Sequence, residues 1–177
     1  AYWLKNNIGL IRSDLVALID ELGKRVFEEM DYLNEAENAE KFRNMHSHNQ
    51  MIAVPKIYKK ITSRRVLTME WIDGTKLTNL EDVRKLGIDP DKMIDIGVQC
   101  SLEQLLEHGF FHADPHPGNL LALEDGRLCY LDFGMMSEVS RESRSGLIQA
   151  VVHLVNKNFD KLSQDFVKLG FLSKEVN

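Results

Sequence analysis

Three residues in the second half of the chain have types and spacing that suit chemistry on a phosphate group. Asp114 is followed five residues later by Asn119, and Asp132 comes thirteen residues after that, within the sequence Asp-Phe-Gly. Magnesium prefers hard oxygen ligands, which a carboxylate and an amide carbonyl supply. We therefore expect Asn119 and Asp132 to hold Mg²⁺, while Asp114 accepts or orients the proton of an attacking hydroxyl.

The segments around these residues predict a rigid carrier for them. Apolar runs at 120–123 and 128–131 flank the turn-forming sequence Glu-Asp-Gly-Arg, so we expect a hairpin with a metal ligand at each end. His112 is expected to brace the loop from below. This order of residues resembles the catalytic loop and the Asp-Phe-Gly element of protein-kinase-like folds, which implies phosphoryl transfer from ATP.

The same loop has an alternative interpretation as a zinc site. His112, Asp114 and His116 alternate, and His-x-Asp-x-His could ligate zinc. Such a site needs further ligands, and the histidines that remain are His46, His48, His108 and His153. It also leaves Asn119 and Asp132 without a role, so the magnesium interpretation is preferred.

Composition narrows the class of protein. The 177 residues are 44% hydrophobic and 28% charged, enough for one core or two small lobes, and no apolar run reaches membrane-spanning length. The net charge of −5 does not indicate a basic surface for binding nucleic acid. Cys100 and Cys129 lie in apolar surroundings and are expected to be buried. The chain starts at Ala1 without an initiator methionine, so we expect a piece of a longer protein.

The remaining segments predict an α+β fold that is mostly helical. Expected helices cover residues 11–30, 34–42, 80–86, 91–108, 141–156 and 160–169. Expected strands cover 54–61 and 65–71, and residues 72–75 form a crossing. The apolar positions expected to be buried in the helix at 141–156 are Leu147, Ile148, Val151, Val152 and Val155.

This order of elements resembles a protein kinase from its C-helix onward. The resemblance implies a partial N-lobe at 1–72 and a helical C-lobe at 73–177. It places Met69 at the gatekeeper position, and it places Glu70, Trp71 and Ile72 on the hinge, whose backbone pairs with adenine. For Met69 and Trp71, plain strand core is an equal alternative.

A block at residues 29–42 makes the resemblance more specific. Its sequence is Glu-Met-Asp-Tyr-Leu-Asn-Glu-Ala-Glu-Asn-Ala-Glu-Lys-Phe. With the His-Ala-Asp-Pro-His-Pro-Gly-Asn loop and Leu-Asp-Phe-Gly-Met, it resembles the UbiB-like (AarF-like) atypical kinases, a family linked to coenzyme Q and prenyl-lipid pathways. The resemblance implies ATP and Mg²⁺ as cofactors. The positions that match family motifs, beyond those already given, are Glu29, Asp31, Glu35, His116, Phe133 and Gly134.

The family pairs the C-helix glutamate, here Glu35, with an ATP-binding lysine, and that partner is missing from this sequence. None of the eleven glycines forms Gly-x-Gly, and no lysine lies in a Val-Ala-x-Lys-like strand before Glu35. The Lys-x-Gly-Gln segment is missing too. We therefore expect weak ATP binding or none, an inactive isolated chain, and an unpaired, hydrated Glu35.

Other features of the sequence differ from those of ordinary protein kinases and bear on the substrate. Six residues separate Gly134 from the next expected helix, no Ala-Pro-Glu follows, and His116 stands where Ser/Thr kinases place a lysine. These features favour ATP hydrolysis or a prenyl-lipid or quinone-precursor ligand over a protein substrate. The alternatives are a phosphotransferase of the aminoglycoside or choline-kinase type and a non-catalytic nucleotide-binding scaffold. Peripheral membrane contact in a bacterium, mitochondrion or plastid is compatible with the family.

Overall fold

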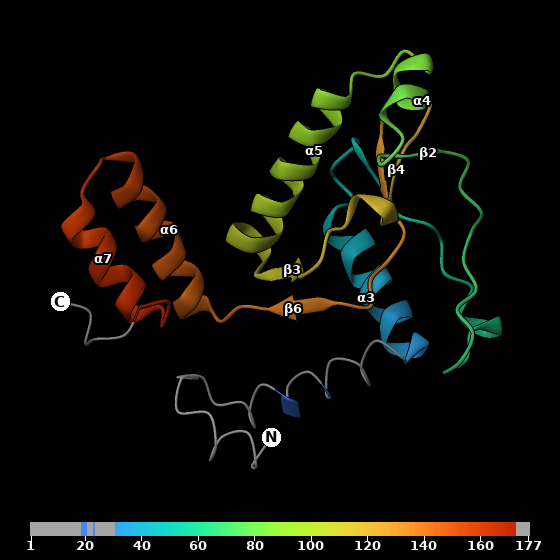
Figure 1. The fold of residues 1–177 in the computed structure, drawn as a ribbon. Coiled ribbons are helices and arrows are strands. Elements are labelled where there is room, and N and C mark those ends of the chain that lie inside the picture. Colours follow the sequence, from blue (N-terminus) through green and yellow to red (C-terminus); the bar gives the residue numbers. More distant parts are fainter. Residues whose placement is uncertain (1–18, 21–22, 24–30, 173–177) are drawn as a thin grey trace, which may run out of the picture.

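The computed structural model describes residues 19–20, 23 and 31–172 (Figure 1). The helix expected at 11–30 falls almost entirely outside this part of the chain, as does Glu29. The helices and helical turns are α3 (Tyr32–Met45), η1 (Lys59–Ile61), α4 (Leu80–Lys85), α5 (Pro90–Glu103), η2 (Gln104–His108), η3 (Pro117–Asn119), α6 (Arg141–Val155) and α7 (Phe159–Lys168). The strands are β1 (Ile52–Ala53), β2 (Thr75–Lys76), β3 (Phe110–His112), β4 (Leu120–Ala122), β5 (Leu128–Tyr130) and β6 (Met136–Glu138).

The predicted fold class is confirmed, with about half of the described chain helical and a small sheet. The sheet has the order β1-β5-β4-β2, in which β4 and β5 form the expected antiparallel hairpin and β1 adds to β5 in parallel. Gly126 allows the tight turn between β4 and β5 with a φ of 84°. Because β1 precedes residue 72 and its partner follows it, one sheet joins both sides of the expected lobe boundary. The division into two lobes stays a prediction.

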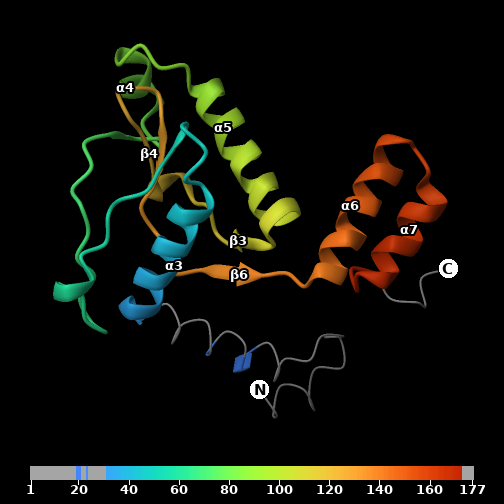
Figure 2. The same ribbon diagram turned by 180° about the vertical axis from the view of Figure 1, so that it is seen from behind.

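Helix α3 and helix α5 cover the sheet and enclose the main core (Figures 1 and 2). Phe42 of α3 packs against Tyr130 of β5, with ring centroids 5.1 Å apart, and α5 contributes Met93 and Cys100. Cys100 and Cys129 are both buried, as expected, and burial raises the pKa of the Cys129 thiol to about 12. These two cysteines therefore act as small apolar side chains.

Helix α5 leads through η2 and β3 into the loop at 112–119, which is called the catalytic loop from its resemblance to that of protein kinases. Asp89 caps the helix by accepting a hydrogen bond from the Asp91 N–H, and Pro90 occupies its first turn. The π-helical turn η2 continues it, and Gly109 ends the helix with a φ of 71°. The expected helix at 91–108 is thus confirmed, although its sequence did not predict the π-helical end.

The two strands expected at 54–61 and 65–71 are wrong as regular strands. The segments do run antiparallel, but the ladder is reduced to bridges that pair Ile57 with Met69 and Ser63 with Val66. Between these bridges η1 interrupts the first segment, and the Thr62 hydroxyl accepts the hydrogen bond of the Thr68 N–H at 3.1 Å. A side chain that replaces a backbone partner in this way prevents a continuous ladder.

Helices α6 and α7 pack against each other beside α5, on the side away from β4 in both ribbon views (Figures 1 and 2). His153 of α6 and Asp165 of α7 form a pair at 2.5 Å. The expected burial of α6 is mostly wrong. Ala150 is its one buried residue, and of the five positions expected to be buried the structure exposes Ile148, Val151, Val152 and Val155.

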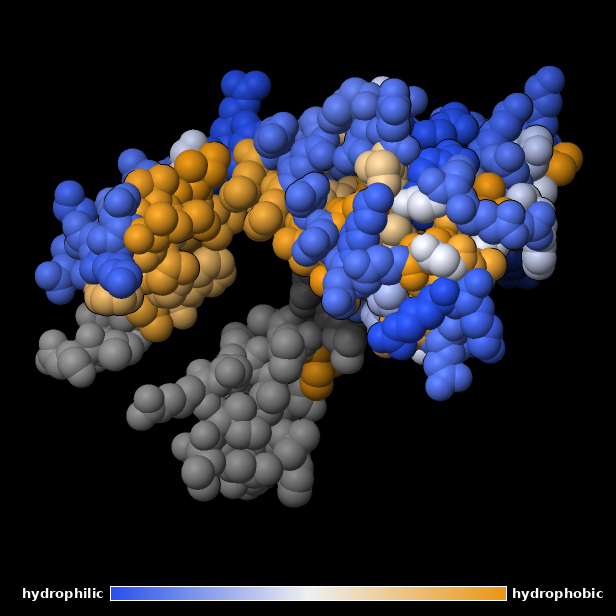
Figure 3. Space-filling view, turned by 90° about the horizontal axis from the view of Figure 1, so that it is seen from above, coloured by the Kyte–Doolittle hydropathy of each residue, from blue (hydrophilic) through white to orange (hydrophobic). Residues whose placement is uncertain are grey.

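The reason for this exposure is the small number of neighbours. Within the described part of the chain, α6 meets α7 and the end of α5, so most of its circumference faces outward. The space-filling view shows a broad apolar patch over these two helices (Figure 3). No helix of the described residues is both long and apolar enough to cross a membrane.

Candidate active site

His112 connects the catalytic loop to the Asp-Phe-Gly segment. It lies at the end of β3, is 8% exposed, and its Nε2 is 2.9 Å from the carbonyl oxygen of Asp132. Its Nδ1 accepts a hydrogen bond from the Asp114 N–H at 3.2 Å, so Nε2 carries the proton and donates to Asp132. Burial lowers the pKa of His112, and this outweighs the opposing effect of its bond to the Asp132 carbonyl and of the nearby Asp132 and Asp114 carboxylates. The neutral ring therefore braces the loop.

The hairpin brings Asn119 and Asp132 together. The Asn119 Nδ2 donates to Asp132 Oδ2 at 2.7 Å, and the Leu131 N–H donates to the Asn119 carbonyl at 3.0 Å. The other carboxylate oxygen of Asp132 accepts from the Gly134 N–H at 2.9 Å. Both side chains are therefore fixed by neighbours on the same short ribbon.

The donor set of this pair fits Mg²⁺. A carboxylate and an amide oxygen are hard ligands, and a 180° turn of the Asn119 amide would place its oxygen beside Asp132 Oδ2. Among the described residues, no group of three His, Cys, Asp or Glu side chains gathers around a possible metal. A magnesium ion held here would take its remaining ligands from phosphate oxygens and water, as this ion usually does.

The zinc alternative finds no support in the described residues. Both ring nitrogens of His112 are already engaged, by Asp132 and Asp114. The Nδ1 of His116 accepts a hydrogen bond from the Gly118 N–H at 3.0 Å and so caps η3. His116 and Asp114 are both exposed, which leaves the Asp114 carboxylate on the open side of the loop.

Helix α3 holds the Asp-Phe-Gly segment from the opposite side. The Glu35 Oε1 accepts a hydrogen bond from the Phe133 N–H at 3.3 Å, and the Asn38 Nδ2 donates to the Phe133 carbonyl at 3.0 Å. Glu35 is 8% exposed. The expectation of an unpaired, hydrated Glu35 is therefore wrong, because the helix turns this carboxylate inward onto Phe133.

Asp31 and Lys41 fix the two ends of α3. Asp31 accepts from the Leu33 N–H as the N-cap and pairs with Arg64 Nε at 3.2 Å. Lys41 pairs with Glu138 of β6 and lies 3.9 Å from the centre of the Phe110 ring. The helix is thereby held against the β3–β6 ribbon that flanks the loop.

The structure separates the residues expected at the hinge. Met69 packs against the main core, Ile72 against a smaller cluster with Leu121, and Trp71 is 86% exposed. The strand-core alternative is therefore wrong for Trp71. The Glu70 N–H bonds back to the Lys56 carbonyl at 2.8 Å. Contact of these residues with adenine stays a prediction.

Two further residues hold the site, although the sequence does not indicate their roles. Asn38 is one, and buried Gln104 is the other: its Oε1 accepts from the His112 N–H at 2.9 Å and its Nε2 donates to the Cys100 sulfur at 3.2 Å. Asn38 lies in the block that carries the family resemblance, but a polar residue on a helix gives no local sign of its partner. Gln104 follows Cys100 by one helical turn, and this spacing does not indicate burial.

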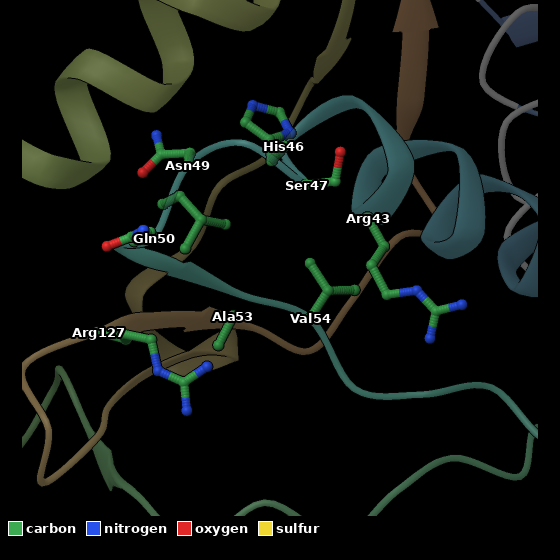
Figure 4. Close-up of a pocket in the computed structure, with 9 residues that line it drawn as sticks. Arg43, His46, Ser47, Asn49, Gln50, Ala53, Val54 and Arg127 are labelled. Carbon is green, nitrogen blue, oxygen red and sulfur yellow. The ribbon is translucent and has the colours of Figure 1, made fainter.

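A cavity of about 390 Å³ lies elsewhere, between the end of α3, β1 and the β4–β5 turn (Figure 4). Figure 4 shows Arg43 and Arg127 on its two sides. None of the predicted site residues lines it. The candidate active site is therefore defined by side-chain geometry and not by this cavity.

The hairpin, the loop held by His112 and the helix that contacts the Asp-Phe-Gly segment together define a kinase-like protein. The chain belongs to the family of the ABC1 atypical kinase-like domain, whose model matches residues 2–166. The resemblance to the UbiB-like and AarF-like kinases is thereby confirmed.

Relatives and a solved structure agree with this membership. The chain is 58% identical over 175 residues to the uncharacterized protein sll0005 of Synechocystis sp., covering 99% of this chain and 26% of the relative. It is 48% identical over 170 residues to the chloroplastic protein ACTIVITY OF BC1 COMPLEX KINASE 3 of Arabidopsis thaliana, covering 96% and 24%. The structure of Rv3197 of Mycobacterium tuberculosis in complex with erythromycin has a TM-score of 0.72 at 25% identity, covering 98% and 43%. The chain thus spans about a quarter of the length of these curated relatives.

Proposed function

We propose that this chain provides the magnesium-binding and catalytic part of an ATP-dependent atypical kinase or ATPase. The observation that carries the proposal is the contact between Asn119 and Asp132 at 2.7 Å, next to a loop that His112 joins to the same segment. Magnesium would neutralise phosphate charge during transfer. Asn119 and Asp132 would supply its protein ligands.

The other residues have proposed roles that follow from their positions. The exposed Asp114 would accept or orient the proton of the attacking hydroxyl or water. His112 keeps the loop in register without taking the proton, because both of its nitrogens are engaged. Glu35 would pair with an ATP-binding lysine, and the backbone of Glu70 and Ile72 would meet adenine. The Ile72 N–H has no hydrogen-bond partner among the described residues, which supports this role.

We propose a small lipid-linked acceptor, or ATP hydrolysis, in place of a protein substrate. Three residues of β6 follow the Asp-Phe-Gly segment closely and pair with β3, with Phe111 opposite Ser137. A segment tied into a ribbon so soon after the metal site provides little surface for docking a peptide. The family's link to prenyl-lipid and quinone pathways, together with chloroplastic relatives such as ACTIVITY OF BC1 COMPLEX KINASE 1 of Arabidopsis thaliana, supports a role at a bacterial or plastid membrane.

The test is the Asp132→Asn variant in the natural full-length polypeptide. We expect it to abolish magnesium-dependent ATP binding, because the amide cannot supply the anionic ligand. The control is Asp95→Asn, which makes the same change at an exposed position of α5. Calorimetric titration of ATP with and without Mg²⁺ measures the effect. Equal magnesium-dependent binding by Asp132→Asn and wild type would refute the metal assignment.

A second experiment tests the acceptor. Turnover of ATP by the full-length polypeptide is measured with vesicles that contain a prenyl quinone precursor and with vesicles that lack it. We expect stimulation by the prenyl lipid. Equal turnover in both, together with phosphorylation of a soluble aminoalcohol, would favour the choline-kinase-type alternative.

A further inference from the structure

One face of α3 holds Phe133 at three points, two on its backbone and one on its ring. The Glu35 Oε1 accepts from its N–H at 3.3 Å, and the Asn38 Nδ2 donates to its carbonyl at 3.0 Å. Phe42, one turn further along α3, packs its ring against that of Phe133 with centroids 5.2 Å apart. Residues three and four apart share a helix face, so all three contacts depend on a single orientation of α3.

These contacts on Phe133 lie one peptide bond from Asp132, whose carboxylate is the proposed magnesium ligand. The carbonyl of Asp132 is held by His112 Nε2 at 2.9 Å, and the next carbonyl, that of Phe133, is held by Asn38. Two successive carbonyls are thereby fixed by donors from two different elements, β3 and α3. With the backbone fixed on both sides, the Asp132 side chain is directed toward Asn119 and Gly134.

We infer that Asn38 is a positioning residue for the Asp132 carboxylate. This inference rests on the proposed function, because it takes Asp132 as a magnesium ligand. Asn38 is suited to the role because a carbonyl in this partly buried place needs a donor, and the amide nitrogen provides one. Glu35 cannot replace it, since a carboxylate has no proton to give to a carbonyl.

Asn38 differs from the residues of α3 that only pack against the core. Asn38 is partly exposed, whereas its neighbours Ala36, Ala39 and Phe42 are fully buried. Shortening Asn38 therefore removes one hydrogen bond and little apolar contact. The effect should appear in the use of magnesium more than in the stability of the fold.

The experiment compares Asn38→Ala, Asn38→Gln and Asn44→Ala in the natural full-length polypeptide. Asn44 is the matched control, since it lies exposed on the same helix and its side chain makes no hydrogen bond to the described residues. The readout is the Mg²⁺ concentration that gives half-maximal ATP binding. For Asn38→Ala we expect a rise of about tenfold, because the backbone that directs the Asp132 carboxylate loses one of its two anchoring hydrogen bonds. Asn38→Gln keeps the donor and should stay within about threefold of wild type.

A second readout needs no nucleotide. In the 177-residue chain, amide hydrogen exchange at Phe133 and Gly134 should be faster in Asn38→Ala than in Asn44→Ala. A magnesium midpoint for Asn38→Ala equal to that of Asn44→Ala, while Asp132→Asn still abolishes binding, would overturn the role of Asn38 and leave the proposed function standing. If Asp132→Asn binds as wild type does, the proposed function fails on its own test. Should Asn38→Ala prove unfolded, the Asn38→Gln midpoint decides. A midpoint more than about tenfold above that of wild type, or loss of binding, in this variant that keeps the donor would reject the inference.

Discussion

At the scale of single residues, the site depends on which atoms of His112 carry protons. Its Nε2–H donates to the Asp132 carbonyl while its Nδ1 accepts from the Asp114 N–H. A second proton on Nδ1 would face that N–H and break the link between the loop and Asp114. Burial favours the neutral ring by lowering the pKa of His112 below its usual value of 6.5.

This arrangement predicts a loss of stability in mild acid. The pKa of His112 is lower in the folded state than its value of 6.5 in the unfolded chain, so the fold has its full stability above pH 6.5. As the pH falls from 6.5 toward the lowered pKa, the unfolded chain binds the proton more readily than the folded one, and stability is lost. His112→Gln should show a smaller change in unfolding free energy between pH 7.5 and pH 5.5 than wild type. His116→Gln, at an exposed position, is the control, and urea titrations at the two values of pH measure the difference. Unchanged pH dependence in His112→Gln would contradict the prediction. His46, whose pKa is lowered chiefly by burial, contributes in the same direction and is unaltered in both variants.

The contacts that could be predicted from the sequence are those between residues joined by a short, regular segment of the chain. Asn119 and Asp132 lie at two ends of one hairpin, so the turn sequence between them was enough to bring them together. Glu35 meets Phe133 across 98 positions, and the meeting depends on how α3 rotates against the sheet. A charged residue on a helix carries no sign of such a partner, which is why its burial was missed.

At the scale of elements, helices with clear ends were predicted well and the irregular ribbon was not. The Asp89-Pro90 start and the Gly109 end of the α5 segment are fixed by local geometry. The alternation of side-chain polarity at 54–61 predicts a strand. It does not reveal that the Thr62 hydroxyl accepts the hydrogen bond of the Thr68 N–H, which a regular ladder would give to a backbone carbonyl. The π-helical turn η2 was not predicted either, and no local pattern indicates that the side chain of its first residue, Gln104, bonds to Cys100 and His112.

Gln104 provides a test at this scale, because it joins the end of α5 to the catalytic loop. Gln104→Leu keeps similar volume but leaves the buried His112 N–H without its acceptor. We expect a loss of about 1–3 kcal/mol in the free energy of unfolding. Gln99→Leu, at an exposed position of the same helix, should change it by less than about 0.5 kcal/mol. Urea unfolding of both variants measures the effect, and equal stability would show that Gln104 does not hold the loop.

At the scale of the whole molecule, α6 and α7 are joined to the rest through few contacts. Arg144 donates to the Glu107 carbonyl at 2.5 Å, and Val139 bonds to Gly109, so the link runs through the end of α5 and the strand β6. The apolar side of this pair faces outward over a broad area (Figure 3). Val155 is 75% and Phe159 63% exposed. Exposed apolar area of this extent favours self-association in water.

The exposed face predicts which substitutions the 177-residue chain tolerates. Val151→Gln with Val155→Gln should change the free energy of unfolding by less than about 1 kcal/mol, because both side chains are exposed and Gln has the higher helix propensity. The same pair should reduce binding of a hydrophobic dye and shift sedimentation toward the monomer. Ala150→Gln, one position away but 4% exposed, should instead destabilise the chain by about 1–3 kcal/mol because it overpacks the α6–α7 contact. If the double valine variant unfolded and Ala150→Gln did not, the inner and outer faces of α6 would be the reverse of those described.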